Sequence, residues 1–173
     1  MNAQNILRIM FGIVAVAFIA FLVRSVPTFI PKAAPFTVEE EETDTWLVSR
    51  VIDGDTIQLS NGEKVRYIGI DAPETKDPRK PVECFGEEAY QKNRELVLGK
   101  RVRLEKDVSE RDKFGRLLRY VWVGDKMVNL ELIKEGYARV YTVPPDVKYQ
   151  KLFQEAEQEA RQFYRGLWGK CNF

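Results

Sequence analysis

The chain has 173 residues, of which 45% are hydrophobic and 31% charged, so it is long enough for one globular domain and an additional segment. Its formal net charge of +1 is too small to indicate a nucleic-acid partner by itself. It contains no histidine, which excludes a histidine base and every zinc site built on imidazole, so any hydrolysis must depend on carboxylates, arginines and a hard metal ion.

An apolar run extends from Ile9 to Val23, between Arg8 and Arg24. As a helix it would span about 22 Å at roughly 1.5 Å per residue, and flanking arginines can snorkel to match the roughly 30 Å hydrocarbon core of a membrane. The run is also as short as the apolar core of a signal peptide, although no small-x-small cleavage motif follows Val23. We expect residues 1–26 to be a transmembrane anchor, with a cleaved signal segment as the alternative.

Residues 27–44 contain several prolines and the acidic run from Glu39 to Glu42, a composition typical of a solvated linker. Residues 45–173 then form the folded domain. A short N-terminal tail before a large domain favours a domain outside the cytoplasm. The protein is therefore expected to be membrane-anchored with an extracytoplasmic domain, or secreted if the first segment is cleaved.

Within the domain, short β-rich runs alternate with turn signals. Strands are expected at 46–51, 56–59 and 65–70, joined by a D-G-D turn and by the hairpin signal Asn61-Gly62. Further along, we expect a helix at 86–98, strands at 102–108 and 117–123, and a short helix from about 129 to 136.

A long amphipathic helix is expected at 148–167, because apolar residues recur there at three- and four-residue steps. We expect this apolar face to pack on the strands; it consists of Tyr149, Leu152, Phe153, Ala156, Ala160, Phe163, Tyr164 and Leu167. Five strands interleaved with three helices predict an α+β fold, a closed β-barrel of the oligonucleotide-binding type (OB-fold) with the helices packed on it.

Two aspartates lie at expected strand ends: Asp55 where a strand leaves the D-G-D turn, and Asp71 where another strand ends before Ala72. Carboxylates presented from adjacent strand ends can share a hard cation such as calcium or magnesium, with carbonyls and water completing its shell. Asp53 either caps its turn or supports the metal ligands from outside the coordination shell. The sequence therefore predicts a metal site at these strand ends.

Glu74 follows Asp71 across a proline and is the best candidate to deprotonate a water in a chain without histidine. Arg66 and Arg116 are suited to a phosphodiester, whose transition state gains negative charge that guanidinium groups stabilise. Arg66 lies five residues before Asp71, so strand alternation would place the two on opposite faces. Their convergence requires a bend or bulge near Gly69.

The segments V-I-D-G-D-T, R-Y-I-G-I-D-A-P-E-T, D-K-F-G-R and M-V-N-L-E-L-I-K-E-G-Y-A-R-V occur in this order along the chain. Together they closely resemble the staphylococcal (micrococcal) nuclease, or thermonuclease, family over about residues 46–169. The resemblance implies a five-stranded OB-fold barrel with three helices. It also implies a calcium-dependent, sugar-nonspecific nuclease that hydrolyses phosphodiester bonds of DNA and RNA and leaves 3′-phosphate ends.

By matching position, the resemblance implies roles for individual residues. Ca²⁺ ligands would be the side chains of Asp55 and Asp71 and the main-chain carbonyl of Ala72. Glu74 would be the general base or would position the water, and Arg66 and Arg116 would bind the phosphate and stabilise the leaving group. Lys113 would contact a phosphate. Phe114 stands where a tyrosine can occur, so it keeps a ring for base stacking without a hydroxyl. Tyr141 is either another stacking residue or a core tyrosine.

The two cysteines, Cys84 and Cys171, are too far apart in sequence for a redox C-x-x-C pair. In an extracytoplasmic domain we expect them to form a disulfide that ties the C-terminal tail to the active-site loop region. In a reducing cytosol they would be free thiols.

The function expected from these features is a nuclease acting on single-stranded DNA and RNA, attached to a membrane by its N-terminal segment. No feature of the sequence implies an obligate protein partner. The alternative is a noncatalytic OB-fold module that binds nucleic acid by stacking and charge. The joint presence of Arg66, Glu74 and Arg116 argues against that alternative, because a binding module has no need of this set.

Overall fold

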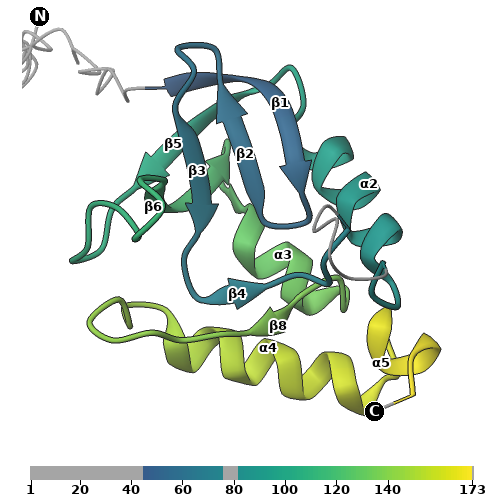
Figure 1. Cartoon of the computed structure of the whole chain (residues 1–173). Helices are drawn as coiled ribbons and strands as arrows, with labels where there is room; N and C mark the ends of the chain where they lie inside the picture. Colours follow the sequence, from purple (N-terminus) through teal and green to yellow (C-terminus); the bar gives the residue numbers. More distant parts are fainter. Residues whose placement is uncertain (1–44, 76–81, 173) are drawn as a thin grey trace, which may run out of the picture. The chain divides into compact units, whose positions relative to one another are not determined.

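The computed structural model describes residues 45–75 and 82–172 (Figure 1). The predicted anchor or signal segment at 1–26 and the linker at 27–44 lie outside these ranges, so both stay predictions. Among the helices of the described ranges, none is long and apolar enough to cross a membrane.

Five strands form a closed barrel (Figure 1). They are β1 (Thr45–Asp53), β2 (Thr56–Leu59), β3 (Lys64–Tyr67), β5 (Arg101–Glu105) and β6 (Leu117–Val123), and the short strand β7 (Lys126–Met127) extends the sheet beyond β6. Neighbours in the order β3-β2-β1-β5-β6 are antiparallel, and a parallel pairing of β3 with β6 closes the barrel. The predicted five-stranded barrel is confirmed.

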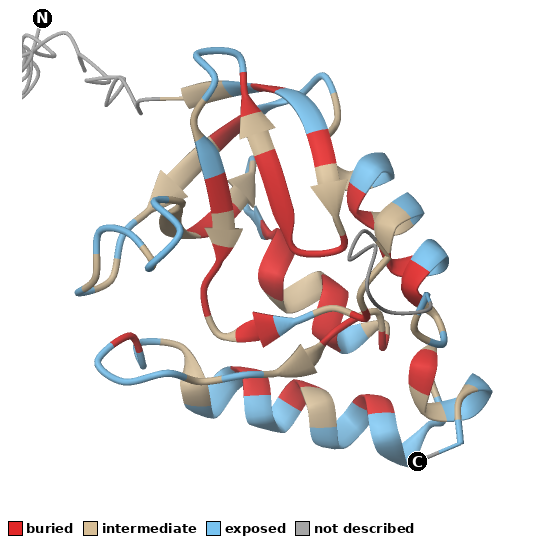
Figure 2. Cartoon of the chain, viewed as in Figure 1, coloured by how far each residue is buried: buried red, intermediate tan, exposed pale blue. Residues whose placement is uncertain are grey.

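Apolar side chains from all five barrel strands fill the interior, where Figure 2 shows the buried positions. Val48, Ile57, Val65, Val102 and Val121, one from each strand, are fully buried. Successive residues of a strand face opposite sides of a sheet, so every second side chain of these strands points into the barrel. Each buried aliphatic side chain stabilises the fold by about 1.5–3 kcal/mol, so the core fixes the strand ends that carry the site.

Three helices of two or more turns and one further short turn accompany the barrel: α2 (Gly86–Val97), α3 (Val128–Lys134), α4 (Gln150–Gln162) and α5 (Leu167–Lys170). α2 packs against β1 and α3, and α3 packs between β6 and α4. α4 runs along the base of the domain in Figure 1. The three predicted helices are therefore present, and α5 is an additional turn.

The last long helix ends earlier than expected, at Gln162 instead of 167. Positive φ angles at Tyr164 (53°) and Gly166 (52°) take the chain off the helical path. The expectation of one continuous buried face was wrong for three of its members: Leu152, Phe163 and Tyr164 are exposed. The chain turns here because Gly166 must approach the Gly136 backbone, where the N–H of Leu167 donates to the Gly136 carbonyl at 2.9 Å.

A separate two-stranded ribbon pairs β4 (Ile70–Asp71) with β8 (Arg139–Val140), which packs against α4. Asp71 lies directly opposite Arg139 in this ribbon. The strand expected at 65–70 is thus divided into β3 and β4. The strand expected at 102–108 stops at Glu105, and the N–H groups of Val108 and Ser109 donate to the Asp146 carboxylate instead of to a strand.

Candidate active site

Arg66 joins two carboxylates that come from separate parts of the chain. Asp55 lies in the turn between β1 and β2, and Asp71 ends β4. The Nη1 atom of Arg66 is 2.7 Å from Oδ2 of Asp55, and its Nη2 atom is 3.0 Å from Oδ1 of Asp71. The structure therefore brings together three of the predicted site residues through one guanidinium group.

A bend at Gly69 makes this convergence possible. β3 ends at Tyr67, and Gly69 has a φ of 79° before the chain enters β4. The Arg66 guanidinium also donates to the main-chain carbonyl of Ile70 at 2.9 Å, beyond the bend. The bend that the sequence required near Gly69 is present, and the side chain of Arg66 bridges it.

Asp55 is a buried carboxylate, only 5% exposed. Burial raises its pKa to about 8, outweighing the lowering effect of the neighbouring Arg66 guanidinium. Its Oδ2 atom accepts the Ala72 N–H at 2.8 Å, and its Oδ1 atom accepts the Thr56 hydroxyl at 3.1 Å. Because burial disfavours the charged form, an additional cation nearby would stabilise this carboxylate as an anion.

The donors in this region fit a hard divalent cation. Asp55 and Asp71 supply carboxylate oxygens, the ligands that calcium prefers in proteins. Across residues 45–75 and 82–172, no three histidine, cysteine, aspartate or glutamate side chains are grouped to hold a metal ion. An ion held by Asp55 and Asp71 would need main-chain carbonyls and water to complete its shell. The three ligand assignments stay predictions.

Asp53 caps the turn that carries Asp55. Its Oδ1 atom accepts the N–H of Asp55 at 3.1 Å. Its main-chain carbonyl accepts Nδ2 of Asn93 at 2.9 Å, and the Oδ1 atom of Asn93 accepts the Tyr67 hydroxyl at 2.9 Å. Helix α2 thus supports the D-G-D turn through the buried side chain of Asn93. The turn cap is visible here, and the Asp53 carboxylate also interacts with the Asp55 side chain and raises its pKa.

Arg116 is oriented by an aspartate in its own loop. Its Nε atom is 2.7 Å from Oδ2 of Asp112, whose Oδ1 accepts the N–H groups of Phe114 and Arg116. Burial would raise the pKa of Asp112, but these hydrogen bonds hold it below its ordinary value. Arg116 Nη1 also lies 3.4 Å from the Thr56 hydroxyl, which in turn contacts Asp55. Thr56 thus connects the second arginine to the carboxylates.

A cavity of about 400 Å³ lies beside the two arginines. Its lining includes Arg66, Arg116, Lys113, Phe114 and Tyr141, so it brings together the predicted phosphate-binding and substrate-binding residues. The Phe114 ring is 72% exposed and lies within cation–π distance of Lys113 Nζ (5.1 Å) and Arg116 Cζ (5.4 Å). Tyr141 is also exposed, which rules out the core alternative for this tyrosine. Exposed rings beside cations are typical of surfaces that stack nucleotide bases.

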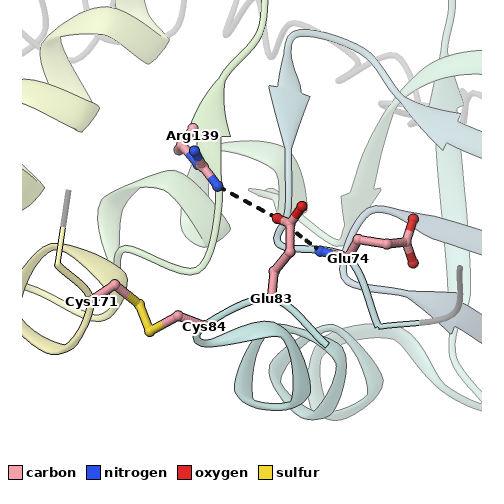
Figure 3. The surroundings of a disulfide bond; sticks show 5 residues. All are labelled: Glu74, Glu83, Cys84, Arg139 and Cys171. Carbon is pink, nitrogen blue, oxygen red and sulfur yellow. Dashed lines mark hydrogen bonds and ion pairs between the residues drawn. A yellow bond between two sulfur atoms is a disulfide. The ribbon is translucent and has the colours of Figure 1, made fainter. Parts of the chain in front are cut away.

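Glu74 follows the bend and β4, at the start of a segment that returns to α2. Its Oε1 atom accepts the N–H of Thr75 at 2.8 Å. Its carbonyl accepts the N–H of Glu83 at 3.0 Å, which places the beginning of α2 beside it. Next to Glu83, Cys84 forms a disulfide with Cys171, and Figure 3 shows Glu83 between this bond and Glu74.

Four functional contacts were not anticipated from the sequence: those of Thr56, Asn93, Asp112 and Glu83. Thr56 and Asp112 lie inside the motifs V-I-D-G-D-T and D-K-F-G-R, so their positions in the sequence indicate a place near the site. Asn93 is a polar residue on the inner face of an amphipathic helix, which was a weaker signal. Nothing in the local sequence distinguishes Glu83 from a solvated glutamate.

The family model described as "Staphylococcal nuclease homologue" matches residues 64–170. Thermonuclease from Staphylococcus intermedius is 44% identical over 128 residues, covering 72% of this chain and 76% of that protein. Thermonuclease from Staphylococcus hyicus is 38% identical over 146 residues, covering 81% and 86%. Endonuclease YncB from Bacillus subtilis (strain 168) is 42% identical over 144 residues, covering 80% and 68%.

The match to the family model covers β3, β5, β6 and the helices and includes Arg66, Asp71, Glu74 and Arg116, whereas β1, β2 and Asp55 precede it. The family match agrees with the closed barrel and its helices. The chain belongs to the staphylococcal nuclease family.

Proposed function

We propose that this nuclease hydrolyses phosphodiester bonds of DNA and RNA in a calcium-dependent reaction, without regard to the sugar, and leaves 3′-phosphate ends. The observation that supports it most directly is the position of Arg66, which contacts both aspartates and also lines the cavity that Arg116 shares. A phosphodiester entering this cavity would meet two guanidinium groups beside a site suited to a hard cation.

Calcium, held by Asp55, Asp71 and the Ala72 carbonyl, would supply positive charge that offsets the charge of the phosphate and orients it. Arg66 and Arg116 donate hydrogen bonds to the non-bridging oxygens, which become more negative in the transition state. Asp112 holds the guanidinium of Arg116 in one orientation, so less freedom is lost when substrate binds.

Glu74 acts as the general base. It takes a proton from the attacking water, whose oxygen forms a bond to phosphorus while the bond from phosphorus to the 5′ oxygen breaks. The 5′ oxygen takes up a proton from solvent water and leaves as a hydroxyl, and the phosphate stays on the 3′ oxygen. Phe114 and Tyr141 hold the strand by stacking on bases, and Lys113 pairs with a neighbouring phosphate.

The test is digestion of end-labelled single-stranded DNA and RNA by the purified protein, with calcium and with a calcium chelator. We expect cleavage of both polymers with calcium and none with chelator. Terminal transferase distinguishes the ends, because a 3′-phosphate blocks extension until a phosphatase removes it. Ends that extend without phosphatase would contradict the proposed bond of attack.

Glu74→Gln tests the base in the same assay. The amide keeps nearly the same shape but cannot take the proton, so we expect cleavage to fall by about 10²–10⁴-fold while DNA binding persists. Full activity of this variant would exclude Glu74 as the base. Binding by the unsubstituted protein without cleavage would support the noncatalytic OB-fold alternative.

We also propose that residues 1–26 anchor the protein in a membrane with its domain on the extracytoplasmic side. The apolar run at 9–23 supports this, and so does the Cys84–Cys171 disulfide, because such bonds persist in oxidising compartments. Membrane fractionation followed by N-terminal sequencing of the native protein tests it. A new N-terminus near residue 26 in the medium would instead indicate a cleaved signal and a secreted enzyme.

A further inference from the structure

We infer that Glu83 is a positioning residue for Glu74, and that the Cys84–Cys171 disulfide and Arg139 together hold Glu83 in place. The inference rests on the proposed role of Glu74 as the base. Glu83 lies nine positions after Glu74 and has no part in the reaction proposed above. Its role would be to hold the main chain of Glu74, the residue that carries the base.

Glu83 contacts the backbone of Glu74 on both sides. Its N–H donates to the Glu74 carbonyl at 3.0 Å, and its Oε2 atom accepts the Glu74 N–H at 3.4 Å. The two peptide units that flank the Glu74 Cα are therefore both tied to one residue. Figure 3 shows the Glu74 side chain pointing away from Glu83, so this contact orients the base without occupying its carboxylate.

Arg139 connects the same carboxylate to the strand that places Asp71. The Nη2 atom of Arg139 lies 3.7 Å from Oε2 of Glu83, the oxygen that also accepts the Glu74 N–H. Figure 3 shows the Glu83 carboxylate between these two groups. Arg139 pairs directly with Asp71 in the β4–β8 ribbon. Glu83 and Arg139 thus connect the base, Glu74, to Asp71, a predicted calcium ligand.

The start of α2 packs closely around the Glu74 peptide. A Cβ atom at Gly86 would lie 2.8 Å from Cγ2 of Thr75 and 3.1 Å from the Glu74 carbonyl oxygen. The N–H of Gly86 donates to the carbonyl of Glu83 at 2.9 Å. A displacement of the 83–86 turn would therefore displace Glu74 as well.

The disulfide attaches this turn to the C-terminal end of the chain. Cys84 follows Glu83, and its partner Cys171 donates its N–H to the carbonyl of Leu167, a fully buried residue. Leu167 in turn donates to the carbonyl of Gly136, in the segment between α3 and β8 that leads to Arg139. The covalent bond and the ion pair therefore hold Glu83 to the same part of the fold, by two separate routes.

The expected consequence is a loss of turnover with little change in substrate binding, because displacing a reacting group by about 1 Å can cost about 100-fold in rate. For Glu83→Ala we expect kcat to fall by about 10-fold or more, with KM for single-stranded DNA unchanged within about 2-fold. Glu83→Gln keeps an oxygen that can accept the Glu74 N–H, so it should retain clearly more activity than Glu83→Ala.

Glu135→Ala is the matched control. The Glu135 side chain is 40% exposed, against 41% for Glu83, and it forms an ion pair of 2.7 Å with Lys92 of α2. Its removal should leave kcat and KM unchanged. Thermal unfolding of each variant establishes that the assay temperature lies below the unfolding transition.

A double-mutant cycle tests the disulfide. Cys84→Ser/Cys171→Ser should lower kcat in the otherwise unsubstituted protein, and should lower it no further when Glu83→Ala is already present. If the combined variant lost kcat by the product of the two separate factors, the claim that the disulfide acts through Glu83 would be overturned. An unchanged kcat in folded Glu83→Ala, beside an inactive Glu74→Gln, would overturn the positioning role and leave the proposed function intact. No cleavage by the unsubstituted protein would overturn both.

Discussion

The guanidinium of Arg66 lies 3.0 Å from the carboxylate of Asp71, although the two residues are five positions apart on what would otherwise be one strand. In a regular strand they would face opposite sides of the sheet. The positive φ of Gly69 divides the strand and brings them to one side. The geometry of the proposed phosphate site therefore depends on an uncharged residue, Gly69, as well as on the charged ones.

Gly69→Ala should destabilise the fold and impair the site. Its φ of 79° is strained for alanine, and the new Cβ would lie 2.7 Å from the buried Phe153 ring. We expect a loss of about 2–4 kcal/mol in the free energy of unfolding, combining backbone strain and overpacking, and a lower kcat in protein that remains folded. Urea unfolding and steady-state kinetics measure the two effects.

Gly99→Ala provides the comparison, because Gly99 has a similar φ of 71° but nothing within 4 Å of the added Cβ. It should lower the free energy of unfolding by only about 1 kcal/mol, through backbone strain alone, and leave kcat unchanged. Equal effects of the two substitutions would show that the contact with Phe153 has no role in the bend.

Asp55 should make stability depend on pH in calcium-free protein. Its pKa is about 8 in the folded state because of burial, above the ordinary value of 3.8 that it regains on unfolding. The folded state therefore binds the proton more tightly, and this contribution to stability falls as pH rises from about 4 to about 8. Asp55→Asn should remove that part of the slope and abolish calcium-dependent cleavage.

Urea unfolding at pH 5, 6, 7 and 8 in the presence of chelator measures this effect. Added calcium should stabilise the unsubstituted protein increasingly toward pH 8, because it binds the ionised carboxylate. The raised pKa of Asp55 would be contradicted if the free energy of unfolding in chelator rose from pH 5 to pH 8, and rose more for the unsubstituted protein than for Asp55→Asn.

Arg116→Lys should reduce turnover far more than binding. Lysine keeps the charge but loses the planar set of donors that reaches Asp112 and the phosphate together. We expect kcat to fall by about 10²–10³-fold, the range found when one transition-state donor is removed. Arg103→Lys, which changes a guanidinium over the Trp122 ring outside the cavity, should leave kcat unchanged. A comparable loss from both variants would point to a nonspecific effect of arginine replacement.

Phe114→Ala should weaken substrate binding without destabilising the protein. The ring is 72% exposed and lines the cavity, so its loss removes stacking worth about 1–3 kcal/mol per base and should raise KM for single-stranded DNA by about 5- to 150-fold. Phe163→Ala removes a ring that is 60% exposed at the end of α4 and should leave KM unchanged. Fluorescence anisotropy of a labelled, slowly cleaved oligonucleotide mixed with the calcium-loaded protein provides an independent measure of binding.

Local patterns in the sequence predicted most of the elements correctly. The strand over 117–123 matches β6, and the D-G-D and Asn61-Gly62 turns separate the first three strands as expected. Such features depend on residues close together in sequence, where turn chemistry and periodicity act directly. The errors arose where distant contacts decide the outcome, as at the end of α4, where the chain turns to reach Gly136.

The same division applies to the site. The sequence by itself predicted Asp55, Arg66, Asp71, Glu74 and Arg116 as site residues, because residue type and motif spacing indicate where carboxylates and guanidinium groups can act together. Only the tertiary structure decided how they meet: one guanidinium between two carboxylates, Thr56 linking Arg116 to Asp55, and Glu83 holding the backbone of Glu74. The physical reason is that burial, hydrogen bonds and ion pairs depend on distances between strand ends and helix starts, which are fixed only when the barrel closes and its core is packed.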